Sequence, residues 1–183
     1  MNANRSSTRK QVVVRKLDKE AVKGFVDPAS YLRPEGVELL DREGRLVSIP
    51  LRDVKGVFFV REFDGNVQRA ERKVFRSRPR LAGLWVRLTF KDSEVLEALL
   101  SNDLLSMDPL GFFLTPPDFY SNNLRMFVPR SALSGIEVLG VVPQAREAAA
   151  RRGWRRSDIS QPRAADYARQ IGLFAPTSTE LSK

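Results

Sequence analysis

The chain has 183 residues, a formal net charge of +9 and 42% hydrophobic residues, which suits one ordinary domain or two small ones. It contains no histidine and no cysteine, which excludes Ser-His-Asp and Cys-His catalysis, thiolate zinc sites and disulfide frameworks. With no apolar run of membrane-spanning length and no apolar signal segment at its start, we expect a cytoplasmic, non-enzymatic protein without catalytic residues, metal, cofactor or membrane contact.

A basic arm is expected at residues 1–10, followed by a β-rich unit at 11–60. Val12 and Val14 alternate with outward positions, which is typical of a half-buried strand, and Asp18-Lys19 marks a hairpin turn. Pro50 cannot donate a hydrogen bond to a strand ladder, so a strand should end there. Two further strands are expected at 36–41 and 56–60.

The segment 61–83 is expected to be an Arg-rich linker or ribbon. Asp64-Gly65-Asn66 is a turn signal, and the segment has seven basic and three acidic residues. Such an arginine cluster would either clamp phosphate or pair with the acidic second unit. The residues proposed here to bind phosphate or nucleic acid are Arg69, Arg72, Lys73, Arg76, Arg78 and Arg80.

The elements of the first unit recur at residues 84–140. The aligned stretches are VVVRKLDKEAVKGF (12–25) with VRLTFKDSEVLEAL (86–99), RPEGVELL (33–40) with DPLGFFLT (108–115), and SIPLRDVKGVFFV (48–60) with FVPRSALSGIEVL (127–139). A repeated supersecondary unit predicts one fold in both halves. The sequence therefore predicts a mainly β protein of two fused five-stranded antiparallel barrels, since closed barrels remove exposed sheet edges.

An aromatic loop and a basic tail complete the chain. Phe119 and Tyr120 lie in a Pro-rich loop, which predicts either a patch that contacts a partner or a plug that closes one barrel end. The tail at 141–183 is expected to hold short helices at 143–154 and 161–174 and a disordered end. Its residues that would stack on a base or bind phosphates, or dock on the protein's own surface, are Arg151, Arg152, Trp154, Arg155 and Arg156.

The succession of strands resembles tandem Sm-like domains, which are small SH3-like β-barrels. The first signature looks like VVVRKLDKEAVKGF and the second like VSIPLRDVKGVFFV; a PilZ-type barrel would give similar strands. The resemblance implies RNA binding, although the Arg-Gly step of RNA-holding Sm-like proteins is absent: these positions read Ile49-Pro50-Leu51 and Val128-Pro129-Arg130. With FFVREFDGN and SNNLRMFVP, the whole chain is also similar to an uncharacterised bacterial family.

Charge and resemblance together leave three functional hypotheses. Because 84–140 has four basic and seven acidic residues, nucleic-acid affinity would come from the linker and tail. The first hypothesis is a binding or adaptor protein that acts through protein contacts, with homo-oligomers formed through strand edges. The alternatives are RNA binding through the basic segments, and PilZ-like sensing of a cyclic dinucleotide through Arg76, Arg78 and Arg80.

Overall fold

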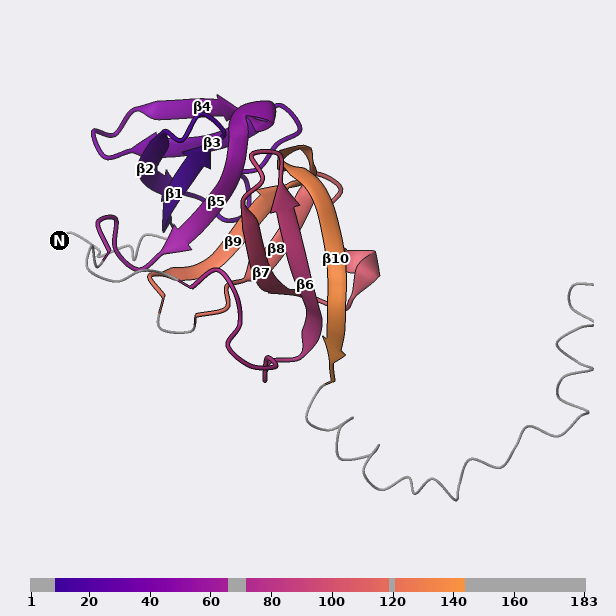
Figure 1. Ribbon diagram of the computed structural model, residues 1–183. Coiled ribbons are helices and arrows are strands. Elements are labelled where there is room, and N and C mark those ends of the chain that lie inside the picture. Colours follow the sequence, from indigo (N-terminus) through magenta and orange to yellow (C-terminus); the bar gives the residue numbers. More distant parts are fainter. Residues whose placement is uncertain (1–8, 66–71, 119–120, 144–183) are drawn as a thin grey trace, which may run out of the picture. The chain divides into compact units, whose positions relative to one another are not determined.

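The computed structural model describes residues 9–65, 72–118 and 121–143, which form a β-structure of ten strands and three short 3-10 helices (Figure 1). All ten strands belong to one antiparallel sheet, in the order β10-β6-β7-β8-β9-β5-β1-β2-β3-β4. The expected mainly β, antiparallel class is therefore confirmed. The sheet consists of two five-strand groups, which we call the first group (β1–β5) and the second group (β6–β10).

Each group has the same succession of elements. The first group comprises β1 (Lys10–Lys16), β2 (Ala21–Val26), β3 (Gly36–Asp41), β4 (Leu46–Pro50), η1 (Leu51–Asp53) and β5 (Val54–Val60). The second group comprises β6 (Gly83–Phe90), β7 (Val95–Leu100), η2 (Leu104–Ser106), β8 (Gly111–Thr115), β9 (Asn123–Pro129), η3 (Arg130–Ala132) and β10 (Leu133–Val142). In both groups a 3-10 turn follows the proline that ends the fourth strand, because proline cannot continue the ladder.

The strands do not close into two barrels as the sequence predicted, but form one open sheet. The reason is the pairing of β5, whose outer edge takes up β9 of the second group, with Val57 opposite Phe127 and Phe58 opposite Met126. This pairing satisfies the backbone groups that barrel closure would otherwise have to satisfy. Within the described sheet, β4 and β10 are left as the two edge strands.

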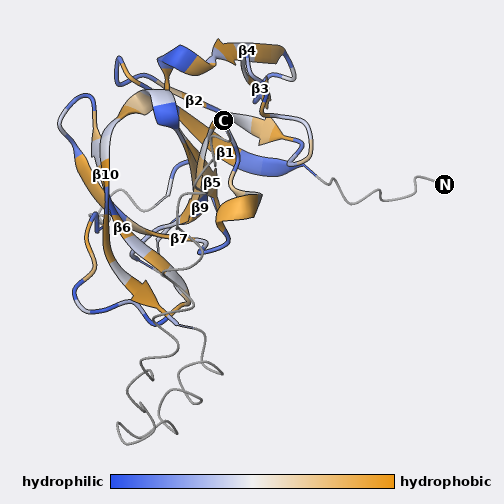
Figure 2. Ribbon diagram, turned by 90° about the vertical axis from the view of Figure 1, so that its right-hand side faces the viewer, coloured by the Kyte–Doolittle hydropathy of each residue, from blue (hydrophilic) through white to orange (hydrophobic). Residues whose placement is uncertain are grey.

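Two hydrophobic cores lie one in each group, and β9 contributes to both. Phe127 is fully buried in the core of the first group, with Val12, Val14 and Val57, whereas the neighbouring Met126 and Val128 are buried in the core of the second. Side chains of a strand alternate between its faces, so a strand that is covered on both faces carries a continuous apolar run. Figure 2 shows this apolar character along the strands of both groups.

A glycine opposite a proline recurs in both groups and allows two backbones to approach closely. Gly36 pairs with Pro50, and Gly111 pairs with Pro129. A Cβ atom built on either glycine would lie 2.3 Å from a carbonyl oxygen of the facing strand. Any larger residue would therefore push the third and fourth strands apart, which explains why the sequence repeat includes these positions.

The connection between the groups, in its described residues 61–65 and 72–82, contains neither strand nor helix. Glu97 on β7 fixes it to the second group. Its buried carboxylate accepts hydrogen bonds from the Trp85 indole (3.1 Å) and the Phe75 backbone N–H (3.1 Å) and pairs with Arg87 (3.2 Å). None of the helices in the described part of the chain is long and apolar enough to cross a membrane.

Candidate functional site

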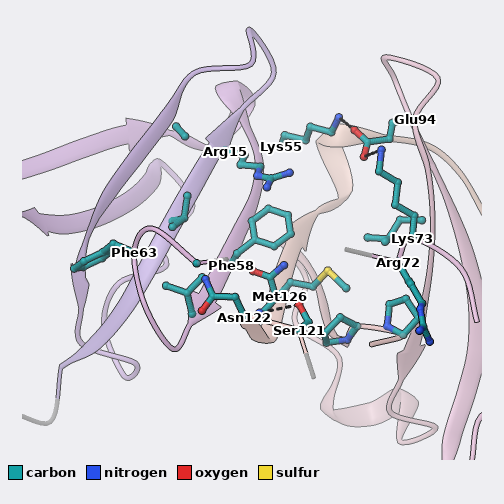
Figure 3. Close-up of a pocket in the computed structure, with 18 of the residues that line it drawn as sticks. Arg15, Lys55, Phe58, Phe63, Arg72, Lys73, Glu94, Ser121, Asn122 and Met126 are labelled. Atoms are coloured by element: carbon teal, nitrogen blue, oxygen red, sulfur yellow. Dashed lines mark hydrogen bonds and ion pairs between the residues drawn. The ribbon is translucent and has the colours of Figure 1, made fainter. Parts of the chain in front are cut away.

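A cleft of about 520 Å³ lies where the two groups meet (Figure 3). Its floor follows one row of paired residues across four strands: Lys23 on β2 is opposite Val13 on β1, Val13 is opposite Phe58 on β5, and Phe58 is opposite Met126 on β9. Since side chains alternate along a strand, this row points away from the face that carries Val12, Val14 and Phe127 into the first core. The β5–β9 pairing is thus what assembles the floor.

Basic side chains outnumber acidic ones around the cleft. Five of the lining residues are basic and two are acidic, namely Arg15, Lys23, Lys55, Arg72 and Lys73 against Asp64 and Glu94. Aromatic and apolar residues lie between them, including Phe58, Phe63, Phe90 and Leu96. A concave surface with an apolar floor and a cationic rim favours a ligand that combines negative charge with a planar or apolar part.

Lys55 bridges the two groups at one end of the cleft. It extends from β5, forms ion pairs with Asp92 and Glu94 of the β6–β7 turn, and lies 4.9 Å from the centre of the Phe90 ring. Burial by itself lowers the pKa of Lys55, but the hydrogen bonds to the two carboxylates outweigh burial and leave the pKa raised. Lys55 in turn lowers the pKa of both carboxyls, so all three groups stay charged at neutral pH.

Two arginines of the cleft differ from the lysines in having no acidic partner among the described residues. Lys23 pairs with Asp64 at 2.7 Å and Lys73 with Glu94 at 3.0 Å. Neither Arg15 nor Arg72 forms an ion pair with a carboxylate in residues 9–65, 72–118 or 121–143. Arg15 and Arg72 are both exposed, so their guanidinium groups are available to an anion.

The position of Arg15 follows from the local sequence. Arg15 is opposite Gly56 in the β1–β5 pairing, so no side chain occupies the facing position. Its guanidinium lies over the neighbouring Phe58 ring, 5.0 Å from the ring centre. Figure 3 shows Arg15 and Phe58 on one wall of the cleft and Arg72 and Lys73 on the other.

Asn122 holds the chain that follows β5 against the cleft. Its side chain accepts the Glu62 backbone N–H at 3.0 Å and donates to the Glu62 carbonyl at 2.7 Å, while its own carbonyl accepts from Arg61 N–H at 3.0 Å. These bonds place Phe63 and Asp64 on the rim, where the ion pair with Lys23 lowers the pKa of Asp64. The chain after β5 is therefore fixed to the residues before β9 by three hydrogen bonds at the edge of the cleft.

The structure divides the arginine cluster that the sequence predicted. Arg72 and Lys73 line the cleft, but Arg76, Arg78 and Arg80 are exposed and do not line it. Arg78 instead donates to the Val141 carbonyl of β10 at 2.7 Å. Arg78 is thus bound to the edge of the sheet, and the phosphate-binding role of the three arginines stays a prediction.

The remaining predicted residues lie outside the described ranges. They are Arg69, Phe119, Tyr120, Arg151, Arg152, Trp154, Arg155 and Arg156, together with the predicted helices at 143–154 and 161–174. Hypotheses that depend on them stay predictions. No group of three or more acidic residues in the described part of the chain is arranged to hold a metal ion.

Sequence reasoning missed the cleft residues of the first group, chiefly Arg15, Lys55 and Phe58. The available signal was alternation: Val13 and Arg15 alternate with the buried Val12 and Val14 and so share the opposite face. That signal places Arg15 on a face but does not show that the same face meets the second group. Only the β5–β9 pairing shows it.

Comparison with known proteins adds one match. A search of curated proteins and a search of solved structures each found no match. The model of one protein family matches residues 8–140, a range that contains the whole first group and nearly all of the second. The chain therefore belongs to DUF6982, a family of unknown function.

Proposed function

We propose that this protein is a non-enzymatic binding protein whose cleft holds a nucleotide, that is, a ligand with phosphate groups and a planar base. The observation that carries the proposal is the pair Arg15 and Arg72, two guanidinium groups that line one cavity and that no carboxylate of the described residues neutralises. The absence of histidine and cysteine from the whole sequence supports binding rather than catalysis.

The chemistry of the lining residues supports this ligand class. Guanidinium groups bind phosphate through two parallel hydrogen bonds, and their planes also stack on aromatic rings. The floor formed by Val13, Phe58 and Met126 offers an apolar and aromatic surface to a base. A volume of about 520 Å³ lies within the range of small-molecule sites.

The proposal differs from both phosphate-binding hypotheses drawn from the sequence. It assigns the phosphates to Arg15 and Arg72 and leaves out Arg76 and Arg80, which do not line the cleft. It also differs from RNA binding through residues 141–183, because a concave cleft of this size suits a small ligand whereas a basic tail follows a long polyanion.

Thermal unfolding and calorimetry with GTP, AMP, cyclic di-GMP and inorganic phosphate test the proposal. We expect at least one nucleotide to raise Tm, by roughly 5–10 °C at a concentration 100 times its Kd. The Arg15→Ala/Arg72→Ala variant should lose this rise, because it lacks both guanidinium groups that are assigned to the phosphates. The Arg76→Ala/Arg80→Ala variant is the matched control, since it removes the same charge from outside the cleft and should keep the rise.

Three results would overturn the proposal. One is the absence of binding by every nucleotide at millimolar concentration. Another is equal binding of inorganic phosphate alone, which would show that the floor takes no base. The third is loss of binding in the Arg76→Ala/Arg80→Ala variant, which would return the function to the linker.

A further inference from the structure

The two groups share one strand-to-strand pairing, and the two edge strands of the sheet correspond to the two strands of that pairing. Inside the chain, β5 of the first group pairs with β9 of the second. By the sequence repeat, β5 corresponds to β10 and β9 corresponds to β4. The edge strands β10 and β4 are therefore the repeat equivalents of β5 and β9, which already pair with each other.

The burial of equivalent residues shows that β10 lacks a covering that β5 has. Val57 of β5 is 0% exposed, whereas its counterpart Ile136 of β10 is 44% exposed. A Cβ atom on Gly56 would lie 3.4 Å from the Phe127 carbonyl of β9, but one on the equivalent Gly135 would meet nothing within 4 Å. The edge of β10 is thus apolar where the same strand of the first group is buried by its neighbour.

The edge strand β4 also exposes a large apolar side chain. Leu46 is 73% exposed on β4, and Val138 is 57% exposed on β10. Exposed strand edges with apolar side chains are sites of strand addition unless charges, prolines or bulges protect them. Arg78 donates to the Val141 carbonyl near the end of β10, and the β10–β6 register shifts between Leu133 and Gly135 and between Val138 and Gly140. The stretch from Ile136 to Val138 lies between these irregularities and pairs regularly with β6.

We propose that copies of this chain associate head to tail, with β10 of one copy paired antiparallel to β4 of the next. The internal pairs Val57–Phe127 and Phe59–Arg125 give the register, which places Ile136 opposite Ser48 and Val138 opposite Leu46. Pro50 does not obstruct this pairing, because its counterpart Pro129 lies beyond the residues of β9 that pair with β5.

A second copy fits these edges better than an unrelated partner does. Each copy carries both halves of a contact whose geometry the chain already uses, and apolar residues would be buried on both sides. Because the two sides are different surfaces, the contact is heterologous and either closes into a ring or extends as a fibre. Two-fold pairing of β10 with β10 would instead place like edges together and leave β4 open.

Engineered cysteines test the register directly, because the chain has none of its own. Two full-length single variants, Val138→Cys and Leu46→Cys, are oxidised separately and as a mixture. We expect disulfide-linked dimers only in the mixture, since directly opposite residues of antiparallel strands bring their Cβ atoms close enough for a disulfide. Dimers formed by Val138→Cys alone would overturn the head-to-tail arrangement, and so would the absence of dimers in the mixture.

The mass in solution provides an independent measurement. Light scattering of the full chain over a concentration series should show species of two or more copies, and Val138→Lys should reduce them to monomer. Leu105→Lys is the matched control, because Leu105 is 98% exposed but belongs to η2 and to neither edge strand, so the mass should stay unchanged. A monomeric full chain whose β10 amides resist hydrogen exchange would overturn the proposal, because the chain's own tail would then cover the edge.

Discussion

The β1–β2 and β6–β7 turns have the same backbone, and each carries an aspartate and a glutamate. In the first turn Lys16 N–H donates to the Glu20 carbonyl, and in the second Phe90 N–H donates to the Glu94 carbonyl. In both turns the aspartate side chain accepts the N–H of the glutamate, at 3.0 and 3.1 Å. We call Asp18 with Glu20 the first acid pair and Asp92 with Glu94 the second acid pair.

The two acid pairs differ in the cation that binds them. Lys16 binds the first pair from its own strand, at 2.8 and 2.7 Å. The position equivalent to Lys16 in the second group is Phe90, and the second pair is bound by Lys55 from the other group. The two turns thus have the same backbone hydrogen bonds, but the first acid pair binds a lysine of its own group and the second binds a lysine of the other group. The fourth strands of the two groups differ in a similar way. Phe127 of β9 is buried in the core of the other group, whereas its repeat equivalent Ser48 lies on the edge strand β4.

The largest effect that would test this comparison is the loss of the Phe127 side chain. Phe127 is fully buried in the first core and its ring lies 5.1 Å from that of Phe113. We expect Phe127→Ala to lower the free energy of unfolding by about 3–5 kcal/mol, and Ser48→Ala to change it by no more than about 0.5 kcal/mol. Urea unfolding of the two variants measures both values.

A small loss in Phe127→Ala would show that the groups are stable without the residue that links their cores. If that variant does not fold at all, Phe127→Leu keeps the test, because it leaves a side chain in the core and should cost less. Equal losses at Phe127 and Ser48 would contradict the difference between the buried and the open strand.

The local features of the fold could be predicted from the sequence. Alternating valines, the Asp-containing turns and the Gly and Pro positions depend on residues close together in the chain, and the strands at 36–41 and 111–115 lie at Gly36–Asp41 and Gly111–Thr115. The resemblance to Sm-like barrels, the adaptor role and the RNA-binding role stay predictions. Many of the residues proposed for these roles lie outside the described ranges, and the comparisons do not test the others.

The long-range features could not be predicted in this way. The β5–β9 pairing joins residues about 70 positions apart, and nothing in either strand's alternation specifies the other as its neighbour. The expectation of closed barrels was wrong for this reason, and the cleft was missed with it. Net charge gave no sign of the cleft either, because the acidic second group supplies Glu94 to a cleft whose charged residues are mainly basic.

An intermediate effect is expected from the two lysines. Lys55→Gln should lower the free energy of unfolding by about 1–3 kcal/mol, because it leaves two partly buried carboxylates without their shared cation. Lys16→Gln should shift the urea midpoint much less, since its partners are largely solvated. Equal shifts in the two variants would contradict the idea that Lys55, unlike Lys16, joins the groups.

The same pair of variants should differ in acid. Lys55 lowers the pKa of Asp92 and Glu94, so their stabilising contribution is fully present above the unfolded-state pKa, about 4, and is lost as the pH falls through the lowered values. We therefore expect the stability of the natural protein to fall more steeply below about pH 4 than that of Lys55→Gln. Urea midpoints between pH 3 and 7 measure the two slopes, and parallel slopes would contradict the assignment.

The smallest expected effect concerns the backbone that the two turns share. Lys19 and Ser93 occupy equivalent positions with φ of 74° and 66°, in the left-handed region that is unfavourable for residues other than glycine. We expect Lys19→Gly and Ser93→Gly each to raise the free energy of unfolding by up to about 1 kcal/mol, because relief of strain slightly exceeds the entropy that glycine adds to the unfolded chain.

Lys91→Gly is the control for this last pair of variants, because Lys91 belongs to the second turn but has no positive φ. It should lower stability, by roughly 0.5–1 kcal/mol. Urea midpoints measure these changes. A loss of stability in Ser93→Gly as large as that in Lys91→Gly would contradict the expected relief of backbone strain. Equal gains at Lys19 and Ser93 would show that the backbone of the two turns is the same independent local structure. The two turns would then differ only in the lysine that binds their acid pair, and not in their backbone.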